Sequence, residues 1–249
     1  TLFKVGDRVS HASMPIGAYS EKHIMPENKL VPVPDGVSDE VASCVTLKGI
    51  TAEYLLHRAY PLKKGDKVLY HAAAGALGQI LCPWANSIGA EIIGTVGSKE
   101  KEEIAKKNGC HHVINYTDKD FVEEVEKIVG KNGIDVVYDG VGLKTFEGSI
   151  NVLKIRGMMV AFGNASGYVD TIDVKKHINA KGLFFTRPSI AHYTIEREEL
   201  LESAKKVFNA VLSGKFKIEI SKKYSLDEVK QAHEDLEGRL LTGPAVIKP

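Results

Sequence analysis

The stretch His71-Ala72-Ala73-Ala74-Gly75-Ala76-Leu77-Gly78 decides the fold of this chain. It follows the apolar run Lys67–Tyr70 and opens a helical pattern that extends to about Ile88, so it predicts a strand, a tight glycine turn and a helix. The missing Cβ atoms at Gly75 and Gly78 let a ligand approach the backbone closely. The helix N-terminus behind the turn offers free N–H groups and a positive dipole end to a diphosphate. This succession of elements predicts a dinucleotide-binding site.

The next predicted strand, Glu91–Val96, indicates which dinucleotide is bound. NAD sites usually hold the ribose 2′-OH with an Asp or Glu about twenty residues past the glycine turn. Here the strand ends without a carboxylate, and Ser98, Lys99 and Lys101 follow it. A hydroxyl and positive charge suit a 2′-phosphate, so the sequence favours NADPH over NADH. Alternatively, Ser98 caps a solvated helix start, and the two roles are compatible.

The composition is that of an ordinary globular protein. The chain has 249 residues, a net charge of +1 and 43% hydrophobic residues, enough for a sizeable core. Near neutrality argues against charge-driven nucleic-acid binding, and no apolar run is long enough to span a membrane. Three widely spaced cysteines predict a reducing compartment, and no Cys/His cluster has the spacing of a structural zinc site. We expect a cytoplasmic protein without a metal.

From residue 66 onward, apolar strands alternate with helices, which predicts a parallel sheet covered on both faces. The predicted strands are Lys67–His71, Glu91–Thr95, His112–Asn115, Ile134–Tyr138, Met158–Phe162 and Leu183–Thr186. The predicted helices between them are Ala76–Ile88, Lys99–Asn108, Lys119–Val129 and Leu143–Leu153. Proline at position 83 costs roughly 3 kcal/mol inside a helix unless the helix kinks or has barely begun. The fold class is therefore α/β, with a doubly wound Rossmann sheet.

The two ends of the chain predict a second, smaller domain. The expected elements are turns leading into strands at Phe3–Val9 and Gly17–Glu21, an unpaired connector at Val31–Gly36, helices capped by Ser38 and Thr194, a helix near Thr51–Ala59, strands at Phe216–Tyr224 and Pro244–Lys248, and a capping box at Ser225–Glu228. We place the dinucleotide domain at residues 46–187 and the second domain at residues 1–45 and 188–249.

Several longer stretches point to one family. They are Gly17–Glu21, Leu47–Leu56, His71–Gly78, Ile92–Lys101, His112–Tyr116, Val136–Gly142, Met158–Gly167, Thr186–Ser189 and Ala232–Arg239. Over almost its whole length the chain resembles the quinone oxidoreductase (zeta-crystallin-like) branch of the zinc-independent medium-chain dehydrogenase/reductase family. The resemblance implies a GroES-like catalytic domain around an NADPH-binding Rossmann domain. It also implies hydride transfer from NADPH to a quinone or an activated alkene, and we expect a homodimer.

The resemblance also implies a set of site residues. The cofactor-binding positions are Ala74, Gly75, Leu77 and Gly78 for the diphosphate, Ser98, Lys101 and Arg239 for the 2′-phosphate, Tyr116 for the adenosine, and Val141, Phe162 and Asn164 for the nicotinamide half. Thr51 matches a residue near the nicotinamide ring, and Arg187 lies at the edge of the cleft. Structural roles stay open for several of them. The alternatives are a helix-start hydroxyl for Thr51, a cover for a strand end for Tyr116, a turn before a proline for Arg187, a solvated charge for Arg239 and a core ring for Phe162. Gly140 stands where the family more often has serine, which would loosen or widen the site.

By this alignment Thr1 falls well inside the family's catalytic domain. The strands that would precede it, and the polar residues with which they line the substrate pocket, are expected to be absent. That absence would spare cofactor binding and put catalysis in doubt. Two hypotheses therefore stand: an NADPH-dependent quinone or enone reductase, or a catalytically silent NADPH-binding protein with a structural or RNA-associated role.

Overall fold

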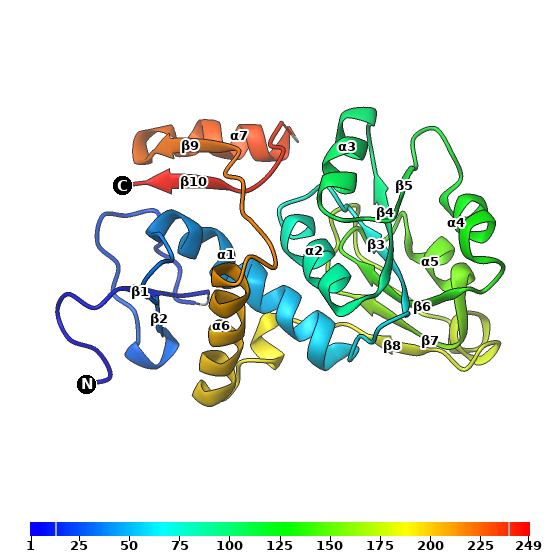
Figure 1. Cartoon of the computed structure of the whole chain (residues 1–249), viewed down its shortest axis with the longest axis horizontal. Coiled ribbons are helices and arrows are strands. Elements are labelled where there is room, and N and C mark those ends of the chain that lie inside the picture. Colours follow the sequence, from blue (N-terminus) through cyan, green and yellow to red (C-terminus); the bar gives the residue numbers. More distant parts are fainter. Residues whose placement is uncertain (13, 239) are drawn as a thin grey trace. The chain divides into compact units, whose positions relative to one another are not determined.

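The computed structural model describes residues 1–12, 14–238 and 240–249, which form two compact units (Figure 1). The first unit comprises Thr1–Tyr54, Gly75–Ile80 and Ile190–Pro249, and the second comprises Leu55–Ala74 and Leu81–Ser189. The division into domains at residues 46 and 187 stays a prediction.

The second unit is built on a six-stranded sheet in the order β5-β4-β3-β6-β7-β8, in which every neighbouring pair is parallel. The strands are β3 (Lys67–His71), β4 (Glu91–Val96), β5 (His112–Asn115), β6 (Ile134–Asp139), β7 (Leu153–Ala161) and β8 (Phe184–Thr186). The helices between them are α2 (Gly78–Ile88), α3 (Lys99–Lys107), α4 (Phe121–Val129), α5 (Phe146–Val152) and the π-helix η3 (Val174–Asn179). The predicted doubly wound α/β fold is confirmed.

A continuous apolar core joins this sheet to α4 and α5. It contains Leu69, Ile93, Ile114, Val125, Val137, Phe146, Ile150 and Met159, each no more than 5% exposed. Complete burial of one such side chain stabilises a fold by about 1.5–3 kcal/mol. The core therefore fixes the strands whose carboxyl ends carry most of the predicted nucleotide-binding residues.

Two details of the second unit differ from the sequence-based expectation. β7 begins at Leu153 rather than at Met158, because its first part pairs with β6 before a register shift. Arg156 there adopts a left-handed φ of 60°, which a hydrophobicity pattern does not reveal. Pro83 lies inside α2 and does not end the helix, which forgoes one backbone hydrogen bond at that point.

The first unit packs two long helices together, α1 (Asp39–Tyr54) and α6 (Arg197–Leu212). Gly49 permits the close approach, since a Cβ there would overlap the Val207 side chain. Glu53 is fully buried beside this contact, and its carboxylate accepts hydrogen bonds from Ser203 Oγ at 2.7 Å and Lys206 Nζ at 3.1 Å. A buried carboxylate needs such partners to offset its lost hydration.

Short elements complete the first unit. They are β1 (Val9–Ser10), η1 (Glu27–Lys29), β2 (Val31–Pro32), η4 (Ile190–His192), β9 (Lys222–Ser225), η5 (Leu226–Glu228), α7 (Val229–Glu237) and β10 (Ala245–Lys248). β1 pairs with β2 antiparallel, and β9 pairs with β10 parallel. The Ser38 cap is confirmed, because its Oγ accepts from Val41 N at 3.2 Å. The capping box between Ser225 and Glu228 is confirmed as well.

Other expectations for this unit are wrong. Residues 39–54 form one helix that continues directly into the π-helix η2 (Leu55–Ala59), instead of two helices. Val31 and Pro32 do pair with β1, and residues 17–21 form no strand, with bends at residues 19–21. Residues 216–221 lie outside β9.

The predicted Thr194 cap is also wrong. The Thr194 hydroxyl donates to the Ile190 carbonyl, at 2.9 Å. Glu196 is the residue that precedes α6, and its N–H donates to the Glu199 carboxylate at 3.4 Å. A capping box of two glutamates therefore opens the helix.

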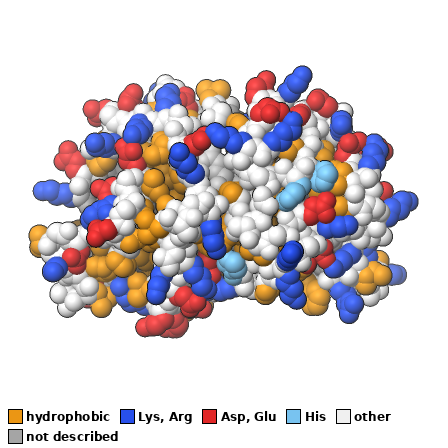
Figure 2. Space-filling view, in the orientation of Figure 1, with side chains coloured by type: hydrophobic (Ala, Val, Ile, Leu, Met, Phe, Trp, Pro, Cys, Tyr) orange, Lys and Arg blue, Asp and Glu red, His pale blue; other side chains and the backbone are white. Residues whose placement is uncertain are grey.

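The surface carries both signs of charge. On the face shown in Figure 2, lysine and arginine side chains alternate with acidic ones and do not gather into one basic patch. Within the described part of the chain, no helix is both long and apolar enough to cross a membrane.

Candidate active site

The glycine turn leaves the carboxyl end of β3 through a strained residue. Ala72 has a φ of 63°, in the left-handed region that non-glycine residues rarely occupy. Two hydrogen bonds hold the residue after it. Ala73 N donates to Thr95 O at 3.0 Å, and Asn108 Nδ2 donates to Ala73 O at 3.1 Å. The start of the turn is thereby tied to the end of β4 and to the end of α3.

The second half of the turn contains the predicted diphosphate residues after Ala74. Gln79 N donates to Gly75 O at 3.2 Å, which is the first hydrogen bond of the helix that follows. The N–H groups of residues 76–78 precede that bond, so helix geometry leaves them without an intrahelical partner. Such N–H groups at a helix start suit an anionic ligand.

Gly94 is a functional position that the sequence analysis missed. A Cβ at this residue of β4 would lie 2.6 Å from the Ala73 Cβ and 2.7 Å from Cys110 Sγ. Glycine is therefore required for β4 to pass beneath the turn. A glycine inside an otherwise apolar strand was the available signal, because it often marks a close approach of another part of the backbone.

The end of β4 brings four predicted or adjacent residues together, namely Gly97, Ser98, Lys101 and Tyr116, which we call the β4 edge. Ser98 is the extended residue before α3, and Tyr116 N donates to Val96 O at 3.1 Å. The Tyr116 ring lies beside the chain here, since a Cβ on Gly97 would be 2.6 Å from its hydroxyl. The side chain is 41% exposed and so remains open to a ligand.

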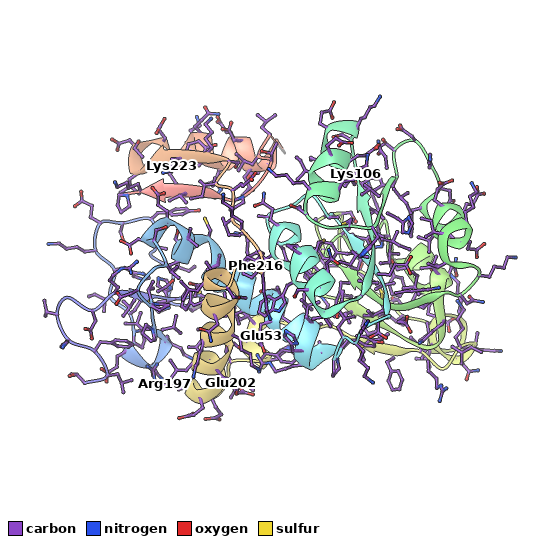
Figure 3. All side chains as sticks on the ribbon, viewed as in Figure 1. Glu53, Lys106, Arg197, Glu202, Phe216 and Lys223 are labelled. Atoms are coloured by element: carbon purple, nitrogen blue, oxygen red, sulfur yellow. The ribbon has the colours of Figure 1, made fainter. Side chains whose placement is uncertain are left out.

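Charge at the β4 edge is available for a ligand. A hydrogen bond from its own backbone N–H, and after it one from the Ser98 hydroxyl, lower the pKa of the Glu100 carboxyl. Lys101 forms no ion pair with any residue in the described ranges. Lys106, labelled on the same helix in Figure 3, differs because its Nζ lies 2.7 Å from the Glu103 carboxylate. The free ammonium group of Lys101 thus fits a phosphate.

The carboxyl ends of β6 and β7 carry two loops, residues 140–145 and 162–167, which we call the β6–β7 loop pair. Ser166 N donates to Val141 O at 2.8 Å, and Leu143 N donates to Gly167 O at 3.1 Å. The backbones approach so closely that a Cβ on Gly142 would lie 2.6 Å from Gly167 O. This loop pair brings Val141 together with the two other residues predicted along the nicotinamide.

Phe162 explains why glycine stands at position 140. A Cβ on Gly140 would lie 3.0 Å from Cε2 and Cζ of the Phe162 ring, so the absence of a side chain there makes room for the ring. The same ring lies parallel to Tyr70, with centroids 6.4 Å apart and an interplanar angle of 4°. Phe162 therefore serves the core as well as the loop.

The polar groups of Val141 and Asn164 differ in their availability. Val141 N donates to Asp139 Oδ1 at 2.7 Å, and its carbonyl accepts from both the N–H and the hydroxyl of Ser166, so a carboxamide would compete with existing partners. The Asn164 side-chain amide has no hydrogen bond within the part of the chain that the structure describes, and the residue is half-buried. It is therefore the freer of the two to meet a ligand.

Three predicted residues remain, Thr51, Arg187 and Arg239. Thr51 belongs to the first unit, and its hydroxyl donates to Leu47 O within α1 at 2.9 Å. Arg187 belongs to the second unit, where its Nη1 donates to Ala161 O at 3.0 Å and holds the end of β7. Arg239 lies outside the described residues.

The sequence analysis also missed Asp139, the last residue of β6, which is fully buried. Its Oδ1 accepts from Val141 N at 2.7 Å and Gly142 N at 2.9 Å, and its Oδ2 accepts from Thr145 Oγ1 at 2.7 Å. A carboxylate directly after the buried run Val136–Tyr138 and before a glycine was the available signal. The three hydrogen bonds make Asp139 the residue that holds the first loop in place.

A chain of buried hydrogen bonds extends from Asp139 to β4. Ser149 Oγ donates to Thr145 O at 2.8 Å and has no second hydrogen to give. His71 Nε2, 2.9 Å away, therefore carries a proton and donates to Ser149, while Nδ1 accepts from the Thr95 hydroxyl at 2.8 Å. Burial lowers the pKa of His71, which keeps the ring neutral.

Potential metal ligands do not gather anywhere in the described ranges. No group of three or more His, Cys, Asp or Glu side chains there is arranged to hold a metal ion. Cys82 and Cys110 lie with their sulfur atoms 3.6 Å apart, and all three cysteines are free and buried.

Comparison with known proteins places the chain. A family model described as zinc-binding dehydrogenase matches residues 76–213. A 2-haloacrylate reductase from a Burkholderia species is 45% identical over 100% of the chain and 76% of that protein. The chain belongs to the quinone oxidoreductase branch of the medium-chain dehydrogenase/reductase family.

Solved structures agree with this assignment. A Pseudomonas syringae quinone oxidoreductase superposes with a TM-score of 0.96 at 40% identity, covering 100% of the chain and 77% of that protein. An Escherichia coli quinone oxidoreductase complexed with NADPH gives 0.95 at 42% identity, covering 99% and 76%. The predicted family, the fold class and the prediction of an oxidoreductase are confirmed, and the NADPH in that neighbour agrees with the cofactor expected from the β4 edge.

Proposed function

We propose that this family member is an NADPH-dependent reductase that transfers hydride to a quinone or to an alkene conjugated to a carbonyl group, without zinc. The β4 edge is the observation that carries the proposal. It offers a serine hydroxyl, an unpaired lysine and an exposed tyrosine ring, and no carboxylate stands at the tip of β4. This donor set fits a 2′-phosphorylated adenosine, whose negative charge the Lys101 ammonium group would attract.

The chain's own residues bind and orient the cofactor in this proposal. The turn at Ala74–Gly78 takes the diphosphate, Ser98 and Lys101 take the 2′-phosphate, and Tyr116 covers the adenosine. Val141, Phe162 and Asn164 lie along the nicotinamide half, with the Asn164 amide as the free hydrogen-bonding group. NADPH, when bound, supplies the hydride. The names of the similar proteins, quinone oxidoreductase and 2-haloacrylate reductase, support quinones and activated alkenes as the substrate class.

Thr51, Arg187 and Arg239 keep their proposed roles on the strength of the resemblance. No side chain among the described residues is assigned as a proton donor to the product. Independence from zinc, a location in the cytoplasm and a homodimer are further parts of the proposal. An open sheet edge at β8, where Phe184 is 57% exposed, supports self-association.

The test combines two measurements on one sample of the full-length protein. NADPH oxidation with 9,10-phenanthrenequinone, before and after dialysis against a chelator, reports turnover and any need for zinc. Titration of NADPH by fluorescence reports binding. Binding with chelator-resistant turnover supports the proposal. Binding without turnover on any quinone or enone would overturn it and favour a silent NADPH-binding protein, whose RNA-associated form would further require salt-sensitive RNA binding in competition with NADPH.

A further inference from the structure

Asp139 joins the two loops of the β6–β7 loop pair through both its side chain and its main chain. The carboxylate accepts the N–H groups of Val141 and Gly142 from the first loop. The main-chain carbonyl accepts the N–H groups of Phe162 and Gly163 from the second loop, at 2.9 and 3.1 Å. One buried residue thereby sets where both loops begin.

We propose that Asp139 is a positioning residue, whose carboxylate holds the Gly140–Gly142 turn in the shape that orients the nicotinamide half of NADPH. This inference rests on the proposed function. It assigns to Asp139 no contact with the cofactor. Its effect passes through the backbone at Val141 and through the facing loop that carries Asn164.

The chemistry of the contacts explains why a carboxylate stands there. Three donors converge on the two oxygens, at 2.7, 2.9 and 2.7 Å, and a carboxylate is the side chain that accepts all three without placing a hydrogen among them. No ion pair in the described part of the chain includes Asp139. These donors alone offset the cost of burying its charge, so shifting any one of them is costly.

The facing loop follows the first because the two are in backbone contact. Ser166 bridges them through two bonds to Val141 O, and its Oγ also accepts from Lys144 N at 3.0 Å. A Cβ on Gly163 would overlap the backbone of Gly140. With no free space between the loops, a turn that relaxes at Gly140–Gly142 displaces residues 163–166 as well.

Asp139 also belongs to the buried chain that runs through Thr145 and Ser149 to His71, so a purely structural role is the competing explanation. A variant of Ser149 distinguishes the positioning role from the purely structural role. Ser149 is fully buried and belongs to the same chain, yet its hydroxyl bonds to His71 and to the carbonyl of Thr145, the last residue of the first loop, and not to the Gly140–Gly142 turn or to the second loop. Removal of its hydroxyl tests core stability without loosening the turn.

The experiment compares wild type, Asp139→Ala, Asp139→Asn and Ser149→Ala in the full-length protein. Hydrogen exchange at the amides of Val141 and Gly142 is measured without cofactor. The affinities for 2′,5′-ADP, which carries the adenosine half alone, and for NADPH are measured by calorimetry, and turnover is followed with 9,10-phenanthrenequinone.

We expect Asp139→Ala to accelerate exchange at both amides and to lower NADPH affinity or kcat by about tenfold or more, with 2′,5′-ADP affinity unchanged. Asp139→Asn is expected to give exchange rates and NADPH affinity between those of the wild type and Asp139→Ala. A neutral amide oxygen accepts weaker hydrogen bonds, and the Thr145 hydroxyl can turn to Gly142 O, 3.0 Å away. Ser149→Ala should leave the ratio of NADPH to 2′,5′-ADP affinity at the wild-type value.

Two results would overturn the inference while the proposed function stands. In the first, the wild type binds and oxidises NADPH, and Asp139→Ala matches it both in hydrogen exchange at the Val141 and Gly142 amides and in the ratio of NADPH to 2′,5′-ADP affinity. The other is equal loss of 2′,5′-ADP and NADPH binding, which indicates a general structural role. If Asp139→Ala does not fold, Asp139→Asn decides by the same criteria. A wild type that does not bind NADPH overturns the proposed function and this inference together.

Discussion

The β4 edge and the β6–β7 loop pair carry the two ends of the proposed cofactor site, and they are built in opposite ways. At the β4 edge, Lys101 has no ion-pair partner in the described residues and the Tyr116 ring is half-exposed. In and next to the loop pair, the carboxylate and carbonyl of Asp139 and the N–H and carbonyl of Val141 are all in hydrogen bonds. In the proposed site, the first region would meet the ligand through free side chains. The second would meet it through the Asn164 amide and a backbone shape that the protein itself maintains.

The largest effect on stability is expected from adding one carbon atom, the Cβ of an alanine, between the two loops of the loop pair. Gly142→Ala places a Cβ 2.6 Å from Gly167 O at a φ of 90°, and should lower the free energy of unfolding by about 3 kcal/mol or more. Gly65→Ala is the matched control, since Gly65 has a φ of 86° and open space around it, and should cost about 1 kcal/mol. Urea denaturation measures both. Equal losses would show that the loops are not tightly apposed.

Lys101→Ala tests the β4 edge and should act on one cofactor only. A charge-assisted contact to the 2′-phosphate contributes about 1.5–3 kcal/mol, so NADPH affinity should fall by about tenfold or more while NADH affinity stays the same. Fluorescence titration with both cofactors measures this. Lys106→Ala, on the same helix but paired with Glu103, should change neither affinity. A matching loss for NADH would remove Lys101 as the discriminating residue.

The buried chain behind the loop pair should make stability fall in acid. Burial lowers the pKa of His71, so between its folded and unfolded pKa values the unfolded chain binds the extra proton. The contribution of the neutral ring to the free energy of unfolding is therefore fully present above about pH 6.5. Below that pH the free energy of unfolding declines, by at most about 1.4 kcal/mol per pH unit for one proton. Urea midpoints from pH 7.5 to 5 measure the slope, and NMR of the His71 ring assigns it. A ring that titrates at its ordinary pKa would contradict the neutral state inferred for it.

Tyr116 should give the smallest effect, because an exposed ring contributes about 1 kcal/mol through stacking. Tyr116→Ala should weaken 2′,5′-ADP binding several-fold, and Tyr116→Phe should not. Calorimetry at one ionic strength compares the two. If the phenylalanine variant loses as much as the alanine variant, the hydroxyl and not the ring makes the contact.

The sequence predicted the two regions to different extents. Strands β3 and β5 were placed with their observed bounds, because each is a short apolar run between polar or glycine-containing segments. Ser98 and Lys101 could be proposed from their own chemistry at the end of β4, and Tyr116 from the family resemblance; their roles stay predictions. The part played by Asp139 could not, because it depends on three donors that meet only after β6, its loop and α5 have folded together.

The errors in the first unit have a similar origin. The sequence predicts two helices, one capped by Ser38 and one near Thr51–Ala59, where the structure has the single helix α1 followed directly by η2, with Gly49 packed against Val207. Thr194 was taken as a helix cap by residue type, whereas the backbone bond to Glu199 determines where α6 begins. Local preferences do not reveal which neighbour a residue meets across the fold.

The crossing of Gly142 and Gly163 bears on how such proteins diversify in evolution. If Ser98 and Lys101 bind the 2′-phosphate as proposed, each acts through its own side chain, so single substitutions at these two residues should change the cofactor preference. A side chain at either glycine requires a compensating change in the facing loop, since each Cβ would meet backbone atoms there. Random libraries should therefore recover altered cofactor preference readily at the β4 edge, while the loop pair persists unchanged through the same generations of selection.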